Sequence, residues 1–172
     1  MKIYKDVFCG DEMFSDAYPI RLVDDCIWEI TGKHIHRVDT GPKLEGANAS
    51  AQVFDEGPES TSHSGVDVVL NHRLNETGFG SKLDFKVYLR DYMKKLVNYL
   101  EENDMKDQIN DFKTNVQKVM KRLLGRFKDL QFFIGESMDP TSMVMMLEYR
   151  DVNGEEKPIL MAFKHGLREV KY

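Results

Sequence analysis

The chain has 172 residues, of which 41% are hydrophobic and 31% charged, and its formal net charge at pH 7 is -5. This length predicts one domain over residues 1–172, and the composition argues against a disordered or membrane-spanning chain. Because no run of 18 apolar residues and no apolar signal-peptide core are present, we expect a cytoplasmic protein without membrane contact. Cys9 and Cys26 are expected to be free thiols, with a disulfide as the less favoured alternative.

The N-terminal third of the chain is predicted to form strands and a loop. Two β-rich runs in "IRLVDDCIWEITGKHIHRV" flank Thr31-Gly32-Lys33, which predicts a hairpin turn at that point. The next segment is rich in Gly, Pro, Ser, Asp and Glu, which predicts a long mobile loop at about residues 39–65. Alternation of Val66, Val68 and Leu70 then predicts a half-buried strand in "VDVVLNHRL".

Apolar residues three or four positions apart predict an antiparallel α-helical hairpin at about residues 82–125. Gly125 is placed to end the second helix. The apolar positions are Phe85, Leu89, Tyr92, Met93, Leu96 and Leu100 in the first helix, and Met105, Ile109, Phe112, Val116, Val119, Met120 and Leu123 in the second.

Strand-like runs return after the helices. These are "LQFFIGES", "MVMMLEYR" and residues 159–163, with a turn signal at Asn153-Gly154. In the first run, Leu130, Phe132 and Ile134 alternate onto one face, and Gly135 would allow a turn or bulge. The whole pattern predicts an α+β fold in which a helical hairpin is inserted between antiparallel strands.

Enzyme motifs are incomplete in this sequence. "GFGSK" at residues 78–82 lacks the spacing of a phosphate-binding loop, and the Gly-x-Ser-x-Gly, His-Glu-x-x-His and Cys-x-x-Cys patterns are missing. Glu136 follows a strand without an accompanying nucleophile or base, so we interpret it as a structural anchor. We therefore expect a non-enzymatic protein.

Metal-binding patterns are weak. His34 and His36 point to the same side of a predicted strand, but an exposed polar face explains them as well. "DVNGEE" from Asp151 starts like a calcium loop and lacks its final glutamate, so it is interpreted as a turn. Two acidic clusters could hold calcium weakly or could simply be solvated, namely Asp11, Glu12 and Asp16, and Asp24 and Asp25.

The predicted helical hairpin is basic within an acidic chain. Residues 82–128 contain 12 Lys and Arg against 7 Asp and Glu, a net charge of +5. Lys82, Lys86, Arg90 and Lys94 recur every fourth residue and so share one side of the first helix. This basic stripe would suit an acidic protein partner, or it could be an ordinary solvated face. Nucleic acid is not expected, because no recognition motif or aromatic run accompanies the lysines.

Two stretches closely resemble the signature regions of the translationally controlled tumour protein family, also called fortilin or histamine-releasing factor. They are "EGANASAQ" at residues 45–52 and "FKDLQFFIGESM" at residues 127–138. "MKIYKD", "DEMFSDAY", "SGVDVVLNH" and "MMLEYRDVNG" are similar to other parts of the same family, so the resemblance covers the whole chain.

The resemblance implies a β-tent, meaning twisted antiparallel sheets with an inserted helical hairpin and a long mobile loop. It also implies weak calcium binding, tubulin and microtubule binding through the hairpin, and promotion of growth and survival with anti-apoptotic proteins as partners. An alternative implied activity is guanine-nucleotide exchange on a small GTPase, Rheb, through Glu12. The implied calcium ligands are Asn48 and Gln131, and the implied phosphorylation site is Ser60. Gln52 departs from the glutamate common in the family, which removes one carboxylate ligand.

Overall fold

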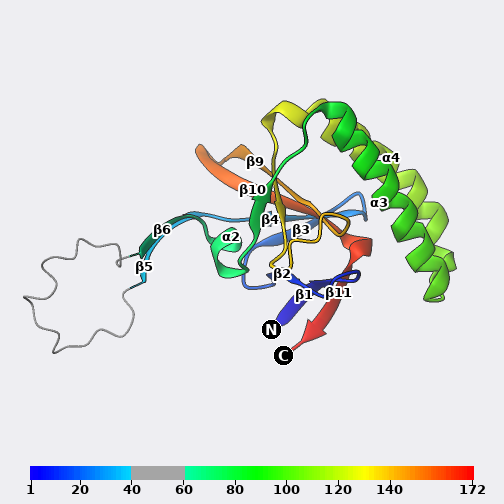
Figure 1. Ribbon diagram of the computed structural model, residues 1–172, viewed down its shortest axis with the longest axis horizontal. Coiled ribbons are helices and arrows are strands. Elements are labelled where there is room, and N and C mark those ends of the chain that lie inside the picture. The colour runs from blue at the N-terminus through cyan, green and yellow to red at the C-terminus, as the bar shows by residue number, and fades with distance from the viewer. Residues whose placement is uncertain (40–60) are drawn as a thin grey trace, which may run out of the picture.

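The computed structural model describes residues 1–39 and 61–172 and shows three antiparallel sheets with a helical hairpin on one side (Figure 1). A three-stranded sheet has the order β11-β1-β2, a six-stranded sheet has the order β3-β4-β10-β9-β8-β7, and β5 pairs with β6. The strands are β1 (Lys2–Asp6), β2 (Glu12–Ser15), β3 (Ile20–Val23), β4 (Ile27–Thr31), β5 (His34–Asp39), β6 (Thr61–Val66), β7 (Asn75–Thr77), β8 (Gln131–Ile134), β9 (Met145–Val152), β10 (Glu155–Phe163) and β11 (Leu167–Lys171).

The helices are α2 (Asp67–Asn71), α3 (Lys82–Glu102) and α4 (Ile109–Gly125), with short 3₁₀ turns η1 (Lys106–Gln108), η2 (Phe127–Asp129) and η3 (Lys164–Gly166). The predicted α+β class and helical hairpin are confirmed. Among the described residues, no helix is long and apolar enough to cross a membrane. The two ends of the chain lie together, because β1 pairs with β11 and the Tyr172 N–H donates to the Met1 carbonyl at 2.8 Å.

The helical hairpin forms where the spacing of apolar residues predicted it. The Ser81 hydroxyl caps α3 by accepting a hydrogen bond from the Asp84 N–H at 3.1 Å. All six predicted apolar positions of α3 are buried, whereas Met105, Ile109 and Met120 around the second helix are only partly buried. Gly125 ends α4 as expected. The core is therefore continuous from the hairpin into the sheets.

Two neighbouring tyrosines of α3 have opposite hydrogen-bonding states. The Tyr88 hydroxyl donates to the Ser142 carbonyl at 2.7 Å and accepts from the Val144 N–H at 2.9 Å. The Tyr92 hydroxyl is buried and has no hydrogen-bond partner among residues 1–39 and 61–172, and it packs so closely on Gly166 that a Cβ there would lie 2.1 Å from it.

We predict that Tyr88→Phe lowers the free energy of unfolding by about 1–3 kcal/mol, because it leaves a buried N–H unpaired. Tyr92→Phe should keep or raise stability, since it removes a hydroxyl that bonds to nothing. Urea denaturation of the two variants checks both expectations. Equal losses in both would contradict the hydrogen-bond assignment.

The hairpin turn predicted at Thr31-Gly32-Lys33 is wrong. β4 ends there and β5 begins, but β4 pairs with β3 and β10, whereas β5 pairs with β6. At Gly32 the chain passes from the six-stranded sheet to the two-stranded β5–β6 sheet. An added Cβ at this position would lie 2.9 Å from the Val66 side chain. The actual hairpin joins β3 to β4 through Asp24 and Asp25, whose φ angles are 54° and 51°.

The strand predicted around Val66–Leu70 is also wrong. β6 ends at Val66, and α2 begins at Asp67. The Asp67 side chain accepts hydrogen bonds from the Lys33 N–H at 3.0 Å and the Val68 N–H at 2.9 Å, which stabilises the change in backbone direction. Val66 and Val68 are both buried, as alternation suggested, but one ends a strand and the other lies in a helical turn. Of the loop predicted at 39–65, the described residues 61–65 are strand and residues 40–60 lie outside the described residues.

The turn predicted at Asn153-Gly154 is confirmed. It joins β9 to β10, and both residues have positive φ, 56° and 84°. The Gly154 N–H donates to the Asp151 side chain at 2.8 Å, which agrees with the interpretation of "DVNGEE" as a turn.

Candidate protein-binding surfaces

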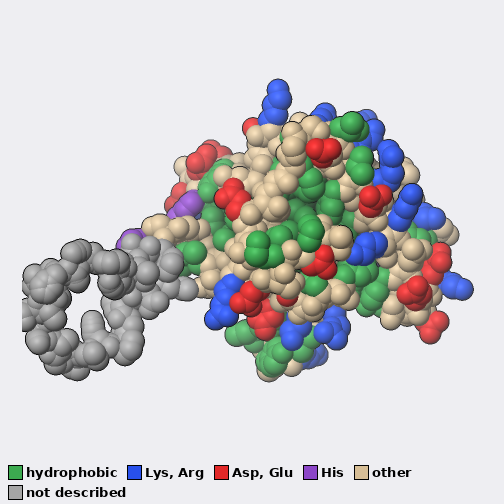
Figure 2. All heavy atoms as spheres, in the orientation of Figure 1, with side chains coloured by type: hydrophobic (Ala, Val, Ile, Leu, Met, Phe, Trp, Pro, Cys, Tyr) green, Lys and Arg blue, Asp and Glu red, His purple; other side chains and the backbone are tan. Residues whose placement is uncertain are grey.

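The basic stripe lies on the outer side of α3. Lys82, Lys86, Arg90 and Lys94 are all exposed, and none forms an ion pair with a residue in the described ranges. Figure 2 shows Lys and Arg side chains gathered along the outer edge of the hairpin, with acidic side chains at its far tip. The stripe is therefore a row of cations without acidic partners from its own chain.

An apolar groove of about 480 Å³ runs between α3 and α4 beside this stripe. Its apolar lining is Met93, Val97, Phe112, Val116 and Met120, and its polar lining is Arg90, Lys94, Asn98, Lys113 and Gln117. No lining residue is acidic. Two residues of the predicted stripe, Arg90 and Lys94, thus belong to the groove, whereas Lys82 and Lys86 lie one to two turns before it.

Two exposed apolar residues extend the groove toward the start of α3. Leu83 is 66% exposed and Val87 is 45% exposed. Val87 lies three residues before Arg90, so the two share one side of the helix. The sequence prediction did not include these residues. Their positions outside the buried side of α3 could have indicated exposed apolar surface. The hairpin therefore presents apolar surface and positive charge together, a combination typical of surfaces that bind other proteins.

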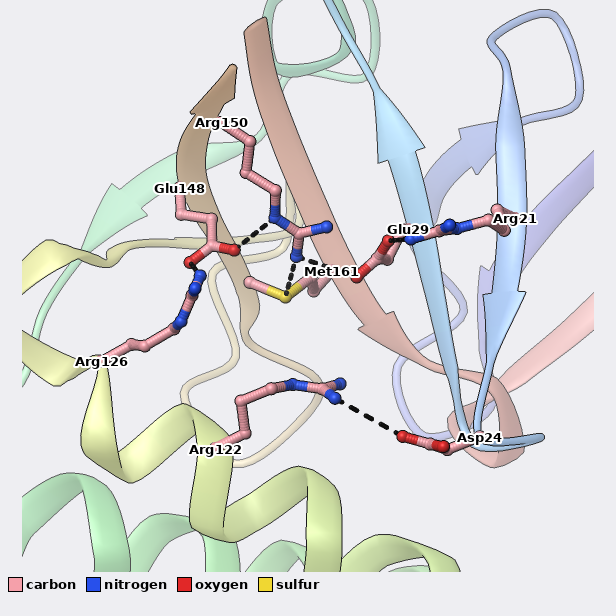
Figure 3. A network of polar contacts seen from close by, with 8 residues as sticks. All are labelled: Arg21, Asp24, Glu29, Arg122, Arg126, Glu148, Arg150 and Met161. Carbon is pink, nitrogen blue, oxygen red and sulfur yellow. Dashed lines mark hydrogen bonds and ion pairs between the residues drawn. The ribbon is translucent and has the colours of Figure 1, made fainter. Parts of the chain in front are cut away.

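A charge network built on two buried glutamates attaches the hairpin to the six-stranded sheet (Figure 3). The Glu148 carboxylate on β9 accepts hydrogen bonds from Arg126, directly after α4, and from Arg150. Arg150 also donates to Glu29 on β4 at 2.8 Å, and Glu29 accepts from Arg21 on β3 at 2.7 Å. These five residues connect the end of the hairpin to three strands.

The network favours the charged forms of Glu29 and Arg150. Burial opposes ionisation of Glu29, but hydrogen bonds from Arg150 and Arg21 outweigh it and hold the pKa of Glu29 below its ordinary value. Burial also opposes the charge of Arg150, and the two glutamates outweigh it and raise the pKa of Arg150. A further contact, Arg122 of α4 to Asp24 at 3.5 Å, lies beside the network (Figure 3).

A second, polar cavity of about 500 Å³ contains Glu12. Glu12 is exposed and is the first residue of β2. Glu136 lies in the same cavity and pairs with Arg73 at 3.0 Å. The remaining lining residues are Lys5, Gly10, Asp11, Asn71 and His72. The structure thus brings together two glutamates that are far apart in sequence.

Asp11, rather than Glu136, anchors the end of β8. The Asp11 carboxylate accepts from the Ser137 N–H at 3.0 Å and from the Ser137 hydroxyl at 2.6 Å. Gly135 makes this approach possible, because a Cβ there would lie 2.7 Å from the Asp11 Cβ. The expectation of Glu136 as a structural anchor is wrong, since Glu136 and Arg73 are 61% and 74% exposed and such pairs contribute about 1 kcal/mol or less.

Only one of the two predicted calcium ligands falls within the described residues. Gln131 is exposed at the start of β8, and Asn48 lies outside the described residues, as do Ser60 and Gln52. Within residues 1–39 and 61–172, no group of three His, Cys, Asp or Glu side chains is arranged to hold a metal ion.

Most other candidate ligands are already engaged. Asp24 contacts Arg122, and the Asp25 carboxylate accepts from Lys164 at 2.8 Å, a hydrogen bond that lowers the pKa of Asp25. His34 bonds to the Tyr149 hydroxyl at 2.9 Å, and His36 bonds to the Ser64 hydroxyl at 2.9 Å. Cys9 and Cys26 are free thiols as predicted, and burial raises the pKa of Cys26 to about 12.

Comparison with known proteins decides the family. The family model described as translationally controlled tumour protein matches residues 1–168. The chain belongs to the translationally controlled tumour protein family. It is 59% identical to the "Translationally-controlled tumor protein homolog" of Aedes albopictus, over 100% of both chains, and 59% identical to that of Drosophila melanogaster, over 99% of both.

Solved structures of the family share the fold. The "Translationally Controlled Tumor-associated Protein p23fyp from Schizosaccharomyces pombe" is 35% identical, with a TM-score of 0.80 and 100% of both chains covered. The translationally-controlled tumor protein of Caenorhabditis elegans is 37% identical, with a TM-score of 0.74, covering 100% of this chain and 99% of that one. The family expected from the two signature stretches is therefore confirmed.

Proposed function

We propose that this family member is a non-enzymatic, cytoplasmic binding protein that contacts tubulin and microtubules through the α3–α4 hairpin. The observation that carries the proposal is the groove with an apolar floor and the cationic residues Arg90, Lys94 and Lys113 along it. An acidic partner would neutralise these cations and cover the apolar floor at the same time. Anti-apoptotic proteins, and a role in growth and survival, belong to the same proposal through the family resemblance.

Microtubule co-sedimentation tests the hairpin. The variant K82E/K86E/R90E/K94E should lose binding at low salt by at least about tenfold, because four attractive charges become repulsive. A matched control is K2E/K33E/K157E/K171E, which changes the net charge equally at lysines that line neither the groove nor the cavity at the far end of the hairpin. Equal binding by both variants at low salt would show that the hairpin is not the contact surface.

We further propose that calcium binds weakly, with Asn48 and Gln131 as ligands. The exposed side chain of Gln131 supports this, because an amide oxygen is one of the ligands that calcium prefers. A calcium titration followed by amide NMR should shift the signals of both residues. Shifts confined to other parts of the chain would refute this assignment.

An alternative proposal is guanine-nucleotide exchange on a small GTPase through Glu12. The specific observation in its favour is the shared cavity of Glu12 and Glu136, in which Glu136 is held by Arg73 and Glu12 makes no ion pair with a described residue. An acidic side chain in such a cavity could approach the metal or the phosphate-binding lysine of a GTPase.

Nucleotide release from the GTPase should accelerate with the wild-type protein and not with Glu12→Ala. Glu76→Ala, at an exposed position of β7, serves as the control. No acceleration by the wild-type protein would end this alternative.

A further inference from the structure

A third cavity, of about 270 Å³, lies where the far end of the hairpin meets the sheets. The hairpin contributes Tyr99 and Leu100 from α3 together with Met105 and Gln108. The sheets and η3 contribute Tyr4, Trp28, Lys164, His165, Leu167, Arg168 and Glu169. The cavity is separate from both the groove and the Glu12 cavity, since no lining residue is shared.

Three aromatic side chains line this cavity, and their neighbours hold them in place. Tyr4 stacks on Phe14 with ring centroids 4.6 Å apart and meets Trp28 at 5.7 Å with a tilt of 59°. Tyr99 packs edge-on against Phe8 at 6.0 Å. Tyr4 is buried, whereas Trp28 and Tyr99 are partly exposed. The aromatic walls are therefore largely fixed before any ligand arrives, which reduces the entropy cost of binding.

The cationic side chains near the cavity are occupied, neutral or directed elsewhere. The Lys164 ammonium donates to Asp25 at 2.8 Å. Burial lowers the pKa of His165 to about 4, so that imidazole is neutral at pH 7. Arg168 is a lining residue as well, but it is the register partner of Lys5, and alternation along β11 directs its side chain to the face opposite that of Tyr4 and Glu169.

Glu169 supplies negative charge at the aromatic cavity. It is the register partner of Tyr4, so both side chains lie on one face of the sheet. Its ion pair with Lys2 is long, 3.8 Å, and exposed to solvent, and its other partner is the neutral Tyr4 hydroxyl, whose pKa is raised by burial and then by Glu169. A carboxylate with a weak partner beside aromatic rings is the arrangement that attracts an organic cation, because the ring faces carry negative potential.

We infer that the cavity formed by Tyr4, Trp28, Tyr99 and Glu169 binds a methylated ammonium group. The group could belong to a small free molecule such as choline or to a trimethylated lysine of another protein, since both present the same cation. Its methyl groups would contact the rings and the apolar side chains of Leu100 and Met105, and its charge would be offset by Glu169. The site depends neither on the groove nor on Glu12.

The intrinsic fluorescence of Trp28 reports on this site directly, because it is the single tryptophan of the chain. We expect choline to change this fluorescence with about tenfold higher affinity than 3,3-dimethyl-1-butanol, which has the same shape without the charge. Ionic strength is held constant with sodium chloride. Equal affinity for the two compounds, or no response to choline or to a trimethyl-lysine peptide, would overturn the inference.

Two variants separate charge recognition from structure. Glu169→Gln should remove most of the preference for choline over its neutral analogue, and Glu155→Gln, an exposed glutamate of β10, should retain it. Identical preferences in the two variants would overturn the role of Glu169.

Peptides carrying lysine or trimethyl-lysine at one position identify the source of the cation. Tighter binding of the methylated peptide than of choline indicates a protein partner, and the reverse indicates a free small cation. Either result supports the inference.

Discussion

Replacing Glu148 with alanine is expected to lower the free energy of unfolding by about 2–3 kcal/mol, the range for losing hydrogen bonds to charged groups. The Glu148 side chain is only 3% exposed and accepts hydrogen bonds from two arginines, Arg126 and Arg150. Its removal leaves a partly buried guanidinium with one fewer anion and also breaks the attachment of α4 to β9. The loss is smaller than for a fully buried ion pair, because Arg126 and Arg150 are 49% and 27% exposed and Arg150 keeps Glu29 as a partner.

Urea denaturation of Glu148→Ala gives this value, and Glu136→Ala provides the matched control. Glu136 also pairs with one arginine, but both partners are exposed, so its loss should cost about 1 kcal/mol or less. A midpoint for Glu148→Ala as close to wild type as that of Glu136→Ala would mean that the network does not hold the hairpin to the sheet.

Acidification from pH 6.5 to about 4 is expected to destabilise the protein by roughly 2 kcal/mol through His165, after allowance for its partial exposure. Burial lowers the pKa of His165 from 6.5 to about 4, assisted by Lys164 and opposed by Asp25. Between these two values the unfolded chain binds a proton that the folded chain does not. Stability from this group is therefore complete above pH 6.5 and is lost as the pH falls to about 4. Burial also lowers the pKa of His72, so acidification changes stability through His72 in the same direction.

The variant His165→Phe should flatten this part of the stability curve, because phenylalanine keeps the packing on Phe112, whose ring centroid is 4.6 Å from that of His165. Glu29 affects stability in a different pH range. Its pKa is lowered from 4.5, so its contribution to stability is lost only as the pH falls below that value. An unchanged slope above pH 4.5 in His165→Phe would contradict the assignment.

The helices were predictable because a helix buries one side, and the spacing of Phe85, Leu89 and Leu96 records that side directly. The strand pairing was less predictable. β4 and β5 are adjacent in sequence, but the turn between them leads into a different sheet, and only Gly32 marks the crossing. The start of α2 depends on the Asp67 hydrogen bond to Lys33, a contact between distant residues that alternation cannot reveal.

The candidate site also has one feature that the sequence predicts and others that only the fold shows. The charges of the basic stripe were visible in sequence, because a spacing of four residues places them on one side of a helix. The groove was not visible, because the spacing of apolar residues does not show that Leu89 and Leu96 are fully buried whereas Met93 and Val97 line an open groove between the helices. No pattern in the sequence links Glu12 to Glu136, whereas the fold places both in one cavity.

Methionine methyl NMR in the presence of tubulin dimers tests the central claim, that the hairpin groove is the binding surface. Met93 and Met120 line the groove, whereas Met138 is exposed and lies two residues after Glu136, a lining residue of the Glu12 cavity. We predict that tubulin shifts or broadens the signals of Met93 and Met120 and leaves Met138 unchanged. Perturbation of Met138 with unchanged Met93 and Met120 would contradict the proposed function.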